Sequence, residues 1–335
     1  MTDRVGVRRG LLAAGLGLAS GLGLGAGMAR GEHAADRFPS RPVTVVVPFP
    51  ANGASDIGAR IVAPALSRAW DQPVIIENRA GTSGTIGADY VAHASPDGHV
   101  LLMGSLGALA IAPGLLGMTE HDPSRELVPV SMVADLPMVL VVADSVRARS
   151  IAELVAEARA RPGELSYGSS GTGHPRHVAA ELFKQATRTD IRHVPLRGGG
   201  PLLVELRAAR IDVAFLMLIE AAEGLRQRWL RPLAVSGPVR VPMLPDVPTL
   251  AETVMPGFDM GNWIGLLAPQ GTAPSRVERI ADTLRDVLAR PEVADRFVGL
   301  GGVPQSSSPA RFAELISVER ARYAALLRRR GIRAG

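Results

Sequence analysis

The sequence predicts an α/β protein built from a repeated unit, in which a short apolar strand leads through a small-residue loop into a helix. The clearest copy begins with Val43–Val47, whose run of β-branched residues is typical of a parallel strand covered on both faces. Pro48 and Pro50 end this strand, because proline has no N–H to donate to a neighbouring strand. Apolar residues then recur at helical spacing as far as Trp70, which completes the unit.

The same order of strand, glycine- and serine-rich loop and apolar helix-like segment recurs in residues 100–107, 165–186 and 191–210. In open α/β sheets, ligands bind outside the carboxyl ends of the strands, and a loop that opens onto a helix offers free N–H groups to a carboxylate or phosphate. We therefore expect the four loops, two in each half of the chain, to converge on one cleft. Ser55 or Asp56 is expected to cap the first helix, and Pro201 to occupy the first position of the last one.

Two places in the remaining chain are interpreted as crossings between two halves of the molecule. The apolar segment Val128–Asp144 is broken at Leu136-Pro137, and the extended run Phe258–Ala268 is the candidate return crossing. Trp263 in that run is expected to pack between the two domains, with stacking on a ligand as the alternative. The other expected elements are strands at 73–77, 211–217 and 231–236 and helices at 86–94, 151–160, 274–289 and from 309 onward.

Composition indicates a globular protein and argues against several classes of function. With 335 residues and 47% hydrophobic content, the chain is long enough for two ordinary domains. It has no cysteine, which excludes disulfides, a lipid-modified cysteine and thiolate chemistry. The net charge of +5 is carried almost wholly by arginine, since Lys184 is the one lysine. Scattered arginines with only 4% aromatic residues do not resemble a nucleic-acid-binding surface.

The N-terminus, residues 1–29, has the pattern of a cleaved signal peptide. Arg4, Arg8 and Arg9 precede a Gly/Leu/Ala-rich run, and Gly27-Met28-Ala29 provides small residues at the cleavage position. The Arg8-Arg9 pair leaves twin-arginine export open beside the general secretory route. An uncleaved membrane anchor is the alternative, but the run is marginal in length and hydrophobicity. We therefore expect an exported protein.

Several long segments, taken together, resemble the Bug (TctC-like) family, the periplasmic substrate-binding components of tripartite tricarboxylate transporters. They are VVVPFPANGASDIGAR, QPVIIENRAGTSGTIGADYVAHASPDGHVLLMG, LSYGSSGTGHPRHVAAELFK, HVPLRGGGP, LPDVPTLAE and FDMGNWIGLLAPQGT. The resemblance runs from about Phe38 to the C-terminus. It implies an α/β, two-domain fold of the type II periplasmic-binding-protein class, with the ligand in the interdomain cleft.

The resemblance further implies a discontinuous first domain, residues 38–138 with 266–335, and a second domain at 139–265. It implies a non-enzymatic protein that captures a small organic carboxylate and delivers it to the membrane subunits of a tripartite tricarboxylate transporter. No cofactor, metal or nucleic acid is implied, and a monomer is expected. The ligand-binding residues carried over by position are Phe49, Ala51, Asn52, Gly53, Ser55, Asp56, Ser105, Ser169, Ser170, Gly173, His174, His177 and Arg197.

The sequence departs from the family pattern in four places. Pro50–Gly53 stands where Pro-Pro-Gly-Gly is usual, His174 where Thr or Ser is usual, Leu196 where Tyr is common, and Leu216-Met217 where a polar pair is frequent. Fewer polar groups make a zwitterionic amino acid a poor fit. We expect a ligand with an apolar or aromatic body and at least one carboxylate, with His174 and Arg176 available for a second anionic contact.

Other interpretations of the same residues remain open at this stage. Asp56 invites a catalytic role, although helix capping already explains it. A metal site at His174, His177 and Glu181 is disfavoured by its spacing, and the segment around Ser169 and Ser170 lacks the G-x-S-x-G pattern of a hydrolase. An extracytoplasmic sensor that presents its ligand to a signalling partner is the leading functional alternative, and a periplasmic hydrolase is the next. The arginines at 328–330 suit either a docking patch or the dipole of a helix C-terminus.

Overall fold

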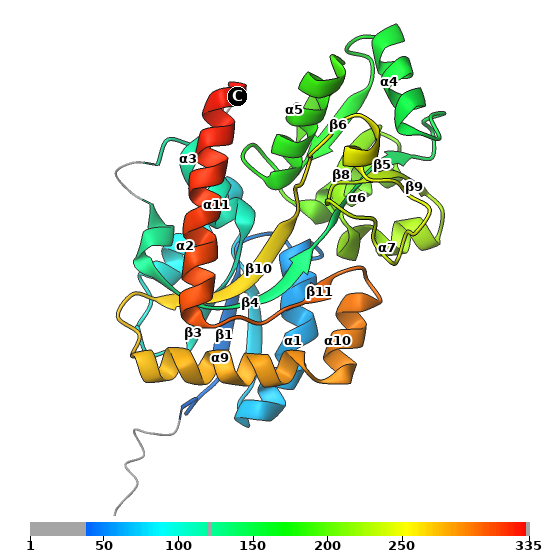
Figure 1. Cartoon of the computed structure of the whole chain (residues 1–335). Coiled ribbons are helices and arrows are strands. Elements are labelled where there is room, and N and C mark those ends of the chain that lie inside the picture. The colour runs from blue at the N-terminus through cyan, green and yellow to red at the C-terminus, as the bar shows by residue number, and fades with distance from the viewer. Residues whose placement is uncertain (1–37, 119–121, 333–335) are drawn as a thin grey trace, which may run out of the picture. The chain divides into compact units, whose positions relative to one another are not determined.

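The computed structural model describes residues 38–118 and 122–332, so the expected signal peptide at 1–29 lies outside the described residues. Two β-sheets carry the described chain (Figure 1). In the text, the first lobe means the six-stranded sheet with the helices that pack on it, and the second lobe means the five-stranded sheet with its helices.

The six-stranded sheet has the order β11-β4-β10-β3-β1-β2. Its parallel part joins β1 to β2 and β3, whereas β10 runs antiparallel to both β3 and β4, and β11 runs antiparallel to β4. The strand bounds are β1 Val43–Val47, β2 Val74–Asn78, β3 Val100–Ser105, β4 Leu127–Leu136, β10 Asn262–Pro269 and β11 Val303–Pro304. The valine-rich β1 lies inside this sheet with nearly every residue buried, as its composition predicts.

The five-stranded sheet has the order β7-β6-β8-β5-β9. Here β6 is parallel to β7 and β8, and β5 is antiparallel to β8 and β9. The strand bounds are β5 Met138–Ala143, β6 Ser166–Ser169, β7 Arg192–Pro195, β8 Val213–Met217 and β9 Leu230–Val235. Both sheets therefore have a parallel part, and loops that follow parallel strands can face one another across the two lobes.

The chain crosses between the sheets at the predicted break. Only Pro137 separates β4 of the first sheet from β5 of the second, and the return lies between β9 and β10. A break at Pro137 is physically reasonable because proline cannot continue the hydrogen bonding of either strand. The division into domains at 138/139 and 265/266 stays a prediction; β10, which pairs with β3 and β4, starts at Asn262.

Most of the helices agree closely with the sequence pattern, and the helix over 151–160 has the predicted bounds. The helices after β8 and after α9 were not predicted, because each follows the preceding element with almost no connecting loop, and the short helix at Leu250–Thr253 was not predicted either. The bounds are α1 Ala54–Trp70, α2 Thr85–Ala92, α3 Ala112–Leu115, α4 Ile151–Ala160, α5 Pro175–Thr187, α6 Gly199–Arg207, α7 Leu218–Arg226, α8 Leu250–Thr253, α9 Pro274–Leu288, α10 Pro291–Val298 and α11 Pro309–Arg330. Short 3₁₀ turns occupy Thr82–Gly84 and Pro123–Glu126, and a π-turn occupies Gly107–Ile111. No helix within residues 38–118 or 122–332 has the length and apolar character that a membrane span requires.

Helix α11 packs along β4 and against the segment that follows β3 (Figure 1). Ser308 caps its first turn by accepting a hydrogen bond from the backbone of Arg311, and Gly331 ends it in the left-handed conformation, both as predicted. Trp263 of β10 lies edge-on to Phe312 of α11, with ring centroids 5.3 Å apart. This ring partner belongs to the first lobe, and the expectation that Trp263 packs between the domains stays a prediction.

Candidate functional site

A pocket of about 480 Å³ lies where loops of the two lobes face each other. The first lobe contributes the loops after β1 and β2 together with Leu116 at the end of α3, and the second lobe contributes the loops after β6 and β7. The lining residues are Phe49, Pro50, Ala80, Gly81, Ser83, Gly84, Leu116, Ser170, Gly171, Thr172, Leu196 and Arg197. The volume is within the range of small-molecule sites, which are typically lined by apolar side chains and a few polar groups.

The polar groups of the pocket suit an anion. Arg197 is exposed at its wall and has no ion pair with another described residue, and none of the lining residues is acidic. The Ser170 hydroxyl accepts a hydrogen bond from the Arg176 guanidinium at 2.5 Å, which leaves its own proton free to donate. Ser83 Oγ donates to the Thr172 carbonyl across the two lobes at 2.5 Å, and this contact closes one side of the pocket.

Beside the pocket lies a fully buried ion pair. The Arg176 guanidinium, at the start of α5, donates to the Glu220 carboxylate, at the start of α7, and both side chains are almost entirely excluded from solvent. The other Glu220 oxygen accepts a hydrogen bond from the backbone N–H of Ala54 in the first lobe, at 2.6 Å. A buried ion pair is stable only when its geometry is good and further hydrogen bonds engage its remaining donors and acceptors. Ser170 and the Ala54 N–H supply such bonds here, whereas the buried Arg176 Nε has no hydrogen-bond partner among the described residues.

The start of α1 differs from the prediction. The helix begins at Ala54, so its N-cap is Gly53 rather than Ser55 or Asp56, and no side chain of the N-cap residue makes a capping bond. Glu220 of the other lobe satisfies a free N–H of the first turn instead, with its negative charge at the positive end of the helix. Gly199 permits this approach, since a Cβ at that position would collide with Glu220 Oε1. Likewise α6 begins at Gly199, two residues before the predicted start at Pro201.

Asp56 lies in the first turn of α1 and ties the preceding loop to the helix. Its carboxylate accepts hydrogen bonds from the Asn52 backbone, the Asn78 amide and the Arg60 guanidinium, each at 2.9 Å. Burial on its own would raise the pKa of Asp56, but these hydrogen bonds and the Arg60 charge hold that pKa below its usual value. The carboxylate is thus ionised and fully engaged in shaping the loop.

His174 caps α5 from within its own lobe. Its Nδ1 accepts a hydrogen bond from the backbone N–H of Arg176 at 3.3 Å, and its ring lies edge-on to Phe49 with centroids 5.7 Å apart. Burial, followed by the charges of Arg176 and His177, lowers the pKa of His174 well below its usual range, so the ring is neutral. Neither residue thus offers a free positive charge, because His174 is neutral and Arg176 is paired with Glu220. The expected second anionic contact from these two residues stays a prediction.

His193, which the sequence reading did not single out, supports the loop after β6. Its Nε2 lies 2.7 Å from Ser169 Oγ, and its ring stacks on Tyr167 and lies against His177, each at 4.7 Å. Burial, together with the charge of His177, lowers the pKa of His193 to about 4. Ser169 is fully buried and also accepts a hydrogen bond from the Gly171 backbone, so this pair of side chains fixes the loop that carries Ser170.

The hydrolase and metal-site interpretations both concern this region. Glu181 accepts hydrogen bonds from the Tyr167 hydroxyl at 2.5 Å and from Lys184 at 2.9 Å, so it does not orient His193 as the acid of a catalytic triad. Among the residues that the structure describes, no three His, Asp or Glu side chains are placed to hold a metal ion.

Of the thirteen residues predicted for the site, the structure places Phe49, Ser170 and Arg197 in the pocket wall. The other ten form the surrounding loops and helix starts, and they are Ala51, Asn52, Gly53, Ser55, Asp56, Ser105, Ser169, Gly173, His174 and His177. Ser105 ends β3 in a buried position and its loop does not line the pocket. The loop after β2 lines the pocket instead, and its run of small residues from Gly81 to Gly84 is the sequence feature that could have predicted this.

Comparison with known proteins gives a consistent result. Residues 58–332 match the family model for TctC, the tripartite tricarboxylate transporter family receptor. The protein BugT of Bordetella pertussis is 34% identical over 299 residues, which cover 89% of this chain and 92% of BugT.

Two solved structures from Rhodopseudomonas palustris are similar over nearly the whole described chain. One, Rpa4515 with adipate, has a TM-score of 0.85 and 34% identity, and the match covers 88% of this chain and 99% of that one. The other, MatC with bound malate, has a TM-score of 0.82 and 30% identity, with coverage of 87% and 100%.

Proposed function

Since the chain belongs to the TctC family of tripartite tricarboxylate transporter receptors, we propose that it captures a small organic carboxylate in the periplasm for a membrane transporter of that type. The observation that carries the proposal is the pocket between the lobes, which has one unpaired guanidinium and no acidic side chain in its wall. The two similar structures from Rhodopseudomonas palustris hold the carboxylates adipate and malate. The expected export signal at residues 1–29 agrees with a periplasmic location.

The pocket favours a ligand with one carboxylate and an apolar body. Arg197 and the Ser170 hydroxyl are the groups for the carboxylate, through charge and hydrogen bonding. Phe49, Leu116 and Leu196 provide apolar surface for the rest of the molecule. Arg176 is neutralised by Glu220, so a second carboxylate has no free buried cation to pair with.

Ligand binding in this arrangement is coupled to the relative position of the two lobes. The pocket wall is complete only when the loops after β1 and β2 meet those after β6 and β7. A ligand that contacts both sets stabilises the closed arrangement by the difference in its affinity for the two states. The two connections, at Pro137 and between β9 and β10, are the hinge segments that such a motion requires. The closed form is the one proposed to dock on the transporter.

A thermal-unfolding screen of the mature protein, refolded to remove carried-over ligand, tests this function. Aromatic and aliphatic monocarboxylates are compared with dicarboxylates, tricarboxylates and amino acids. A ligand at about one hundred times its Kd adds roughly 2.7 kcal/mol to the free energy of unfolding, which shifts the midpoint clearly. We expect the largest shifts with monocarboxylates that have an apolar body.

Two variants locate the binding site in the same screen. Arg197→Gln and Ser170→Ala should reduce the shift, whereas Arg192→Gln, an exposed arginine of β7 that does not line the pocket, should leave it unchanged. Shifts with sugars, cations or peptides but with no carboxylate contradict the proposed ligand class. Turnover of a simple ester that is lost in Ser169→Ala favours the hydrolase instead.

A further inference from the structure

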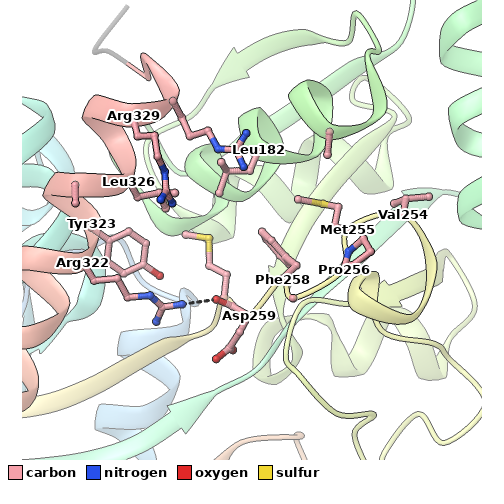
Figure 2. A pocket seen from close by; sticks show the side chains of 15 residues that line it. Leu182, Val254, Met255, Pro256, Phe258, Asp259, Arg322, Tyr323, Leu326 and Arg329 are labelled. Atoms are coloured by element: carbon pink, nitrogen blue, oxygen red, sulfur yellow. Dashed lines mark hydrogen bonds between the residues drawn. The ribbon is translucent and has the colours of Figure 1, made fainter.

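A second and larger pocket, of about 610 Å³, lies apart from the site described above and shares no residue with it (Figure 2). Its walls come from α5 of the second lobe, from α11 of the first lobe, and from the segment at 254–260 that leads back into β10. The lining residues are Leu182, Ala186, Val254, Met255, Pro256, Gly257, Phe258, Asp259, Met260, Arg322, Tyr323, Ala325, Leu326, Arg329 and Arg330. We call it the hinge-side groove.

The floor of the hinge-side groove is apolar. Met255 and Tyr323 are buried in its lining, and Phe258 and Leu326 are half-buried and add apolar surface (Figure 2). Met260 is buried and lines the groove as well. Methionine side chains are flexible and polarisable, so they adapt to apolar ligands of different shapes. An apolar body placed here gains the free energy of leaving water without displacing any polar partner.

The rim of the groove is cationic. Arg322, Arg329 and Arg330 line it, and Asp259 is the one acidic residue among the lining side chains. Arg322 is engaged, since it donates to the Asp259 carbonyl at 2.7 Å and to Glu319 at 3.2 Å. Arg329 and Arg330 form no ion pair with any described residue, so the described groove carries two uncommitted positive charges beside apolar surface.

The helix dipole does not by itself explain this placement. Cations anywhere in the last turn of α11 interact favourably with its C-terminus, and Arg328 has the same advantage. Arg328 nevertheless faces a different part of the surface and does not line the groove. The end of α11 is also held beside α5, because the Gln185 amide donates to the Arg330 carbonyl at 3.0 Å.

From these observations we propose that the hinge-side groove is a second binding site, for a small amphipathic anion. Arg329 and Arg330 bind the anionic head, and the apolar body lies on Met255, Phe258 and Leu326. The volume matches that of small-ligand sites, and charge complementarity selects an anion rather than a neutral or cationic amphiphile. This site is additional to the carboxylate pocket and does not depend on the function proposed for it.

Titration calorimetry with hexyl, octyl and decyl sulfate, each below its micelle concentration, tests the proposal. Because these probes are sulfates, they separate the groove from a site selective for carboxylates. Burial of each added methylene contributes about 0.8 kcal/mol, so the affinity should rise roughly fourfold per CH₂. The double variant Arg329→Gln/Arg330→Gln should lose at least about tenfold in affinity, the order expected for charged hydrogen bonds.

Arg328→Gln is the matched control, because it removes the same charge from the same helical turn without touching the groove. It should bind decyl sulfate as the unmodified protein does. Equal losses in Arg328→Gln and in the double variant would show a non-specific charge effect and overturn the proposal. So would equal binding of decyltrimethylammonium, or competition between decyl sulfate and a carboxylate bound in the other pocket.

Titration with an acidic amphipathic peptide tests whether the groove binds a protein partner instead of a small anion. Binding of an acidic amphipathic peptide, with no binding of any alkyl sulfate, would replace the small anion by a protein partner. A thermal shift with carboxylates that survives in the double variant shows that the protein is folded. The same measurement distinguishes a failure of the proposal for the hinge-side groove from a failure of the proposed carboxylate site.

Discussion

Helices α1 and α5 both begin beside the pocket between the lobes, yet they are capped in opposite ways. The α5 helix is capped within its own lobe, by His174 Nδ1, and its loop is held by the contact between Ser169 and His193. The α1 helix has Gly53 as its N-cap, and Glu220 of the other lobe binds the N–H of Ala54. One helix start is therefore complete in a separate lobe, and the other is complete only when the lobes meet.

This difference in capping identifies the hydrogen bond between Glu220 and Ala54 as a contact that holds the two lobes together. A buried carboxylate that loses its partners is strongly unfavourable, so Glu220 has no comparable environment once α1 moves away, apart from Arg176 in its own lobe. Water has to replace the Ala54 N–H when the lobes separate. The hydrogen bond from Ala54 to Glu220 therefore favours the closed arrangement even without a ligand, and a bound ligand adds its own contribution.

The largest expected effect comes from removing this carboxylate. Glu220→Ala leaves the Arg176 guanidinium buried without its ionic partner, and loss of one member of a buried pair costs about 3–5 kcal/mol of unfolding free energy. Urea denaturation measures the change, and small-angle scattering should show a larger radius of gyration because the contact to Ala54 is lost.

Glu223→Ala is the control for this variant, because Glu223 lies on the same helix, is half-exposed and pairs with exposed Arg226. Its cost should be at most about 1 kcal/mol. If Glu220→Ala costs no more than Glu223→Ala, the buried pair does not stabilise the protein as described.

A smaller effect on the free energy of unfolding, one that depends on pH, is expected at His193, which supports the loop before α5. The folded pKa of His193 is about 4, below the usual 6.5, so between these values the unfolded state binds more protons. The stabilisation of the folded state by the neutral His193 ring is complete above pH 6.5, and it is lost as the pH falls toward 4. His193→Gln, whose amide can still contact Ser169, should flatten this part of the stability curve.

His93→Gln is a useful comparison, because His93 is exposed and hydrogen bonding to Asp89 raises its pKa. Its removal should change the pH dependence in the opposite direction, since a raised pKa stabilises the fold at low pH. An unchanged curve for His193→Gln between pH 6.5 and 4 would mean that the imidazole is not held neutral by its surroundings.

The smallest effect is expected at the self-contained cap. His174→Ala removes the acceptor for the Arg176 N–H and should cost about 1 kcal/mol, the usual contribution of an N-cap side chain. The cap bond lies within one lobe, but the variant also removes the ring contact between His174 and Phe49 of the first lobe, so the radius of gyration without ligand should increase less than in Glu220→Ala. An increase as large as that of Glu220→Ala would remove the contrast between the two helix starts.

Much of the architecture follows from local sequence. The valine run at 43–47, the break at Pro137 and the Ser308 and Gly331 signals around α11 each predict an element that the structure contains. These features depend on interactions between residues close together in the chain, namely strand-forming side chains, a missing N–H and caps. For the same reason the loops that follow the strands were found, and three of the predicted site residues line the pocket.

The sequence by itself determined the family, the α/β class and the small-residue loops that face the cleft. Only the tertiary structure decided that Glu220, far from Ala54 in sequence, caps α1, and that Arg176 is neutralised rather than available to a ligand. An acidic residue inside the apolar run Val213–Ala222 was the only local signal of that burial. Residues as distant in the chain as Ala54 and Glu220 produce no recognisable periodicity or spacing in the sequence, because their contact depends on how the two sheets are placed against each other.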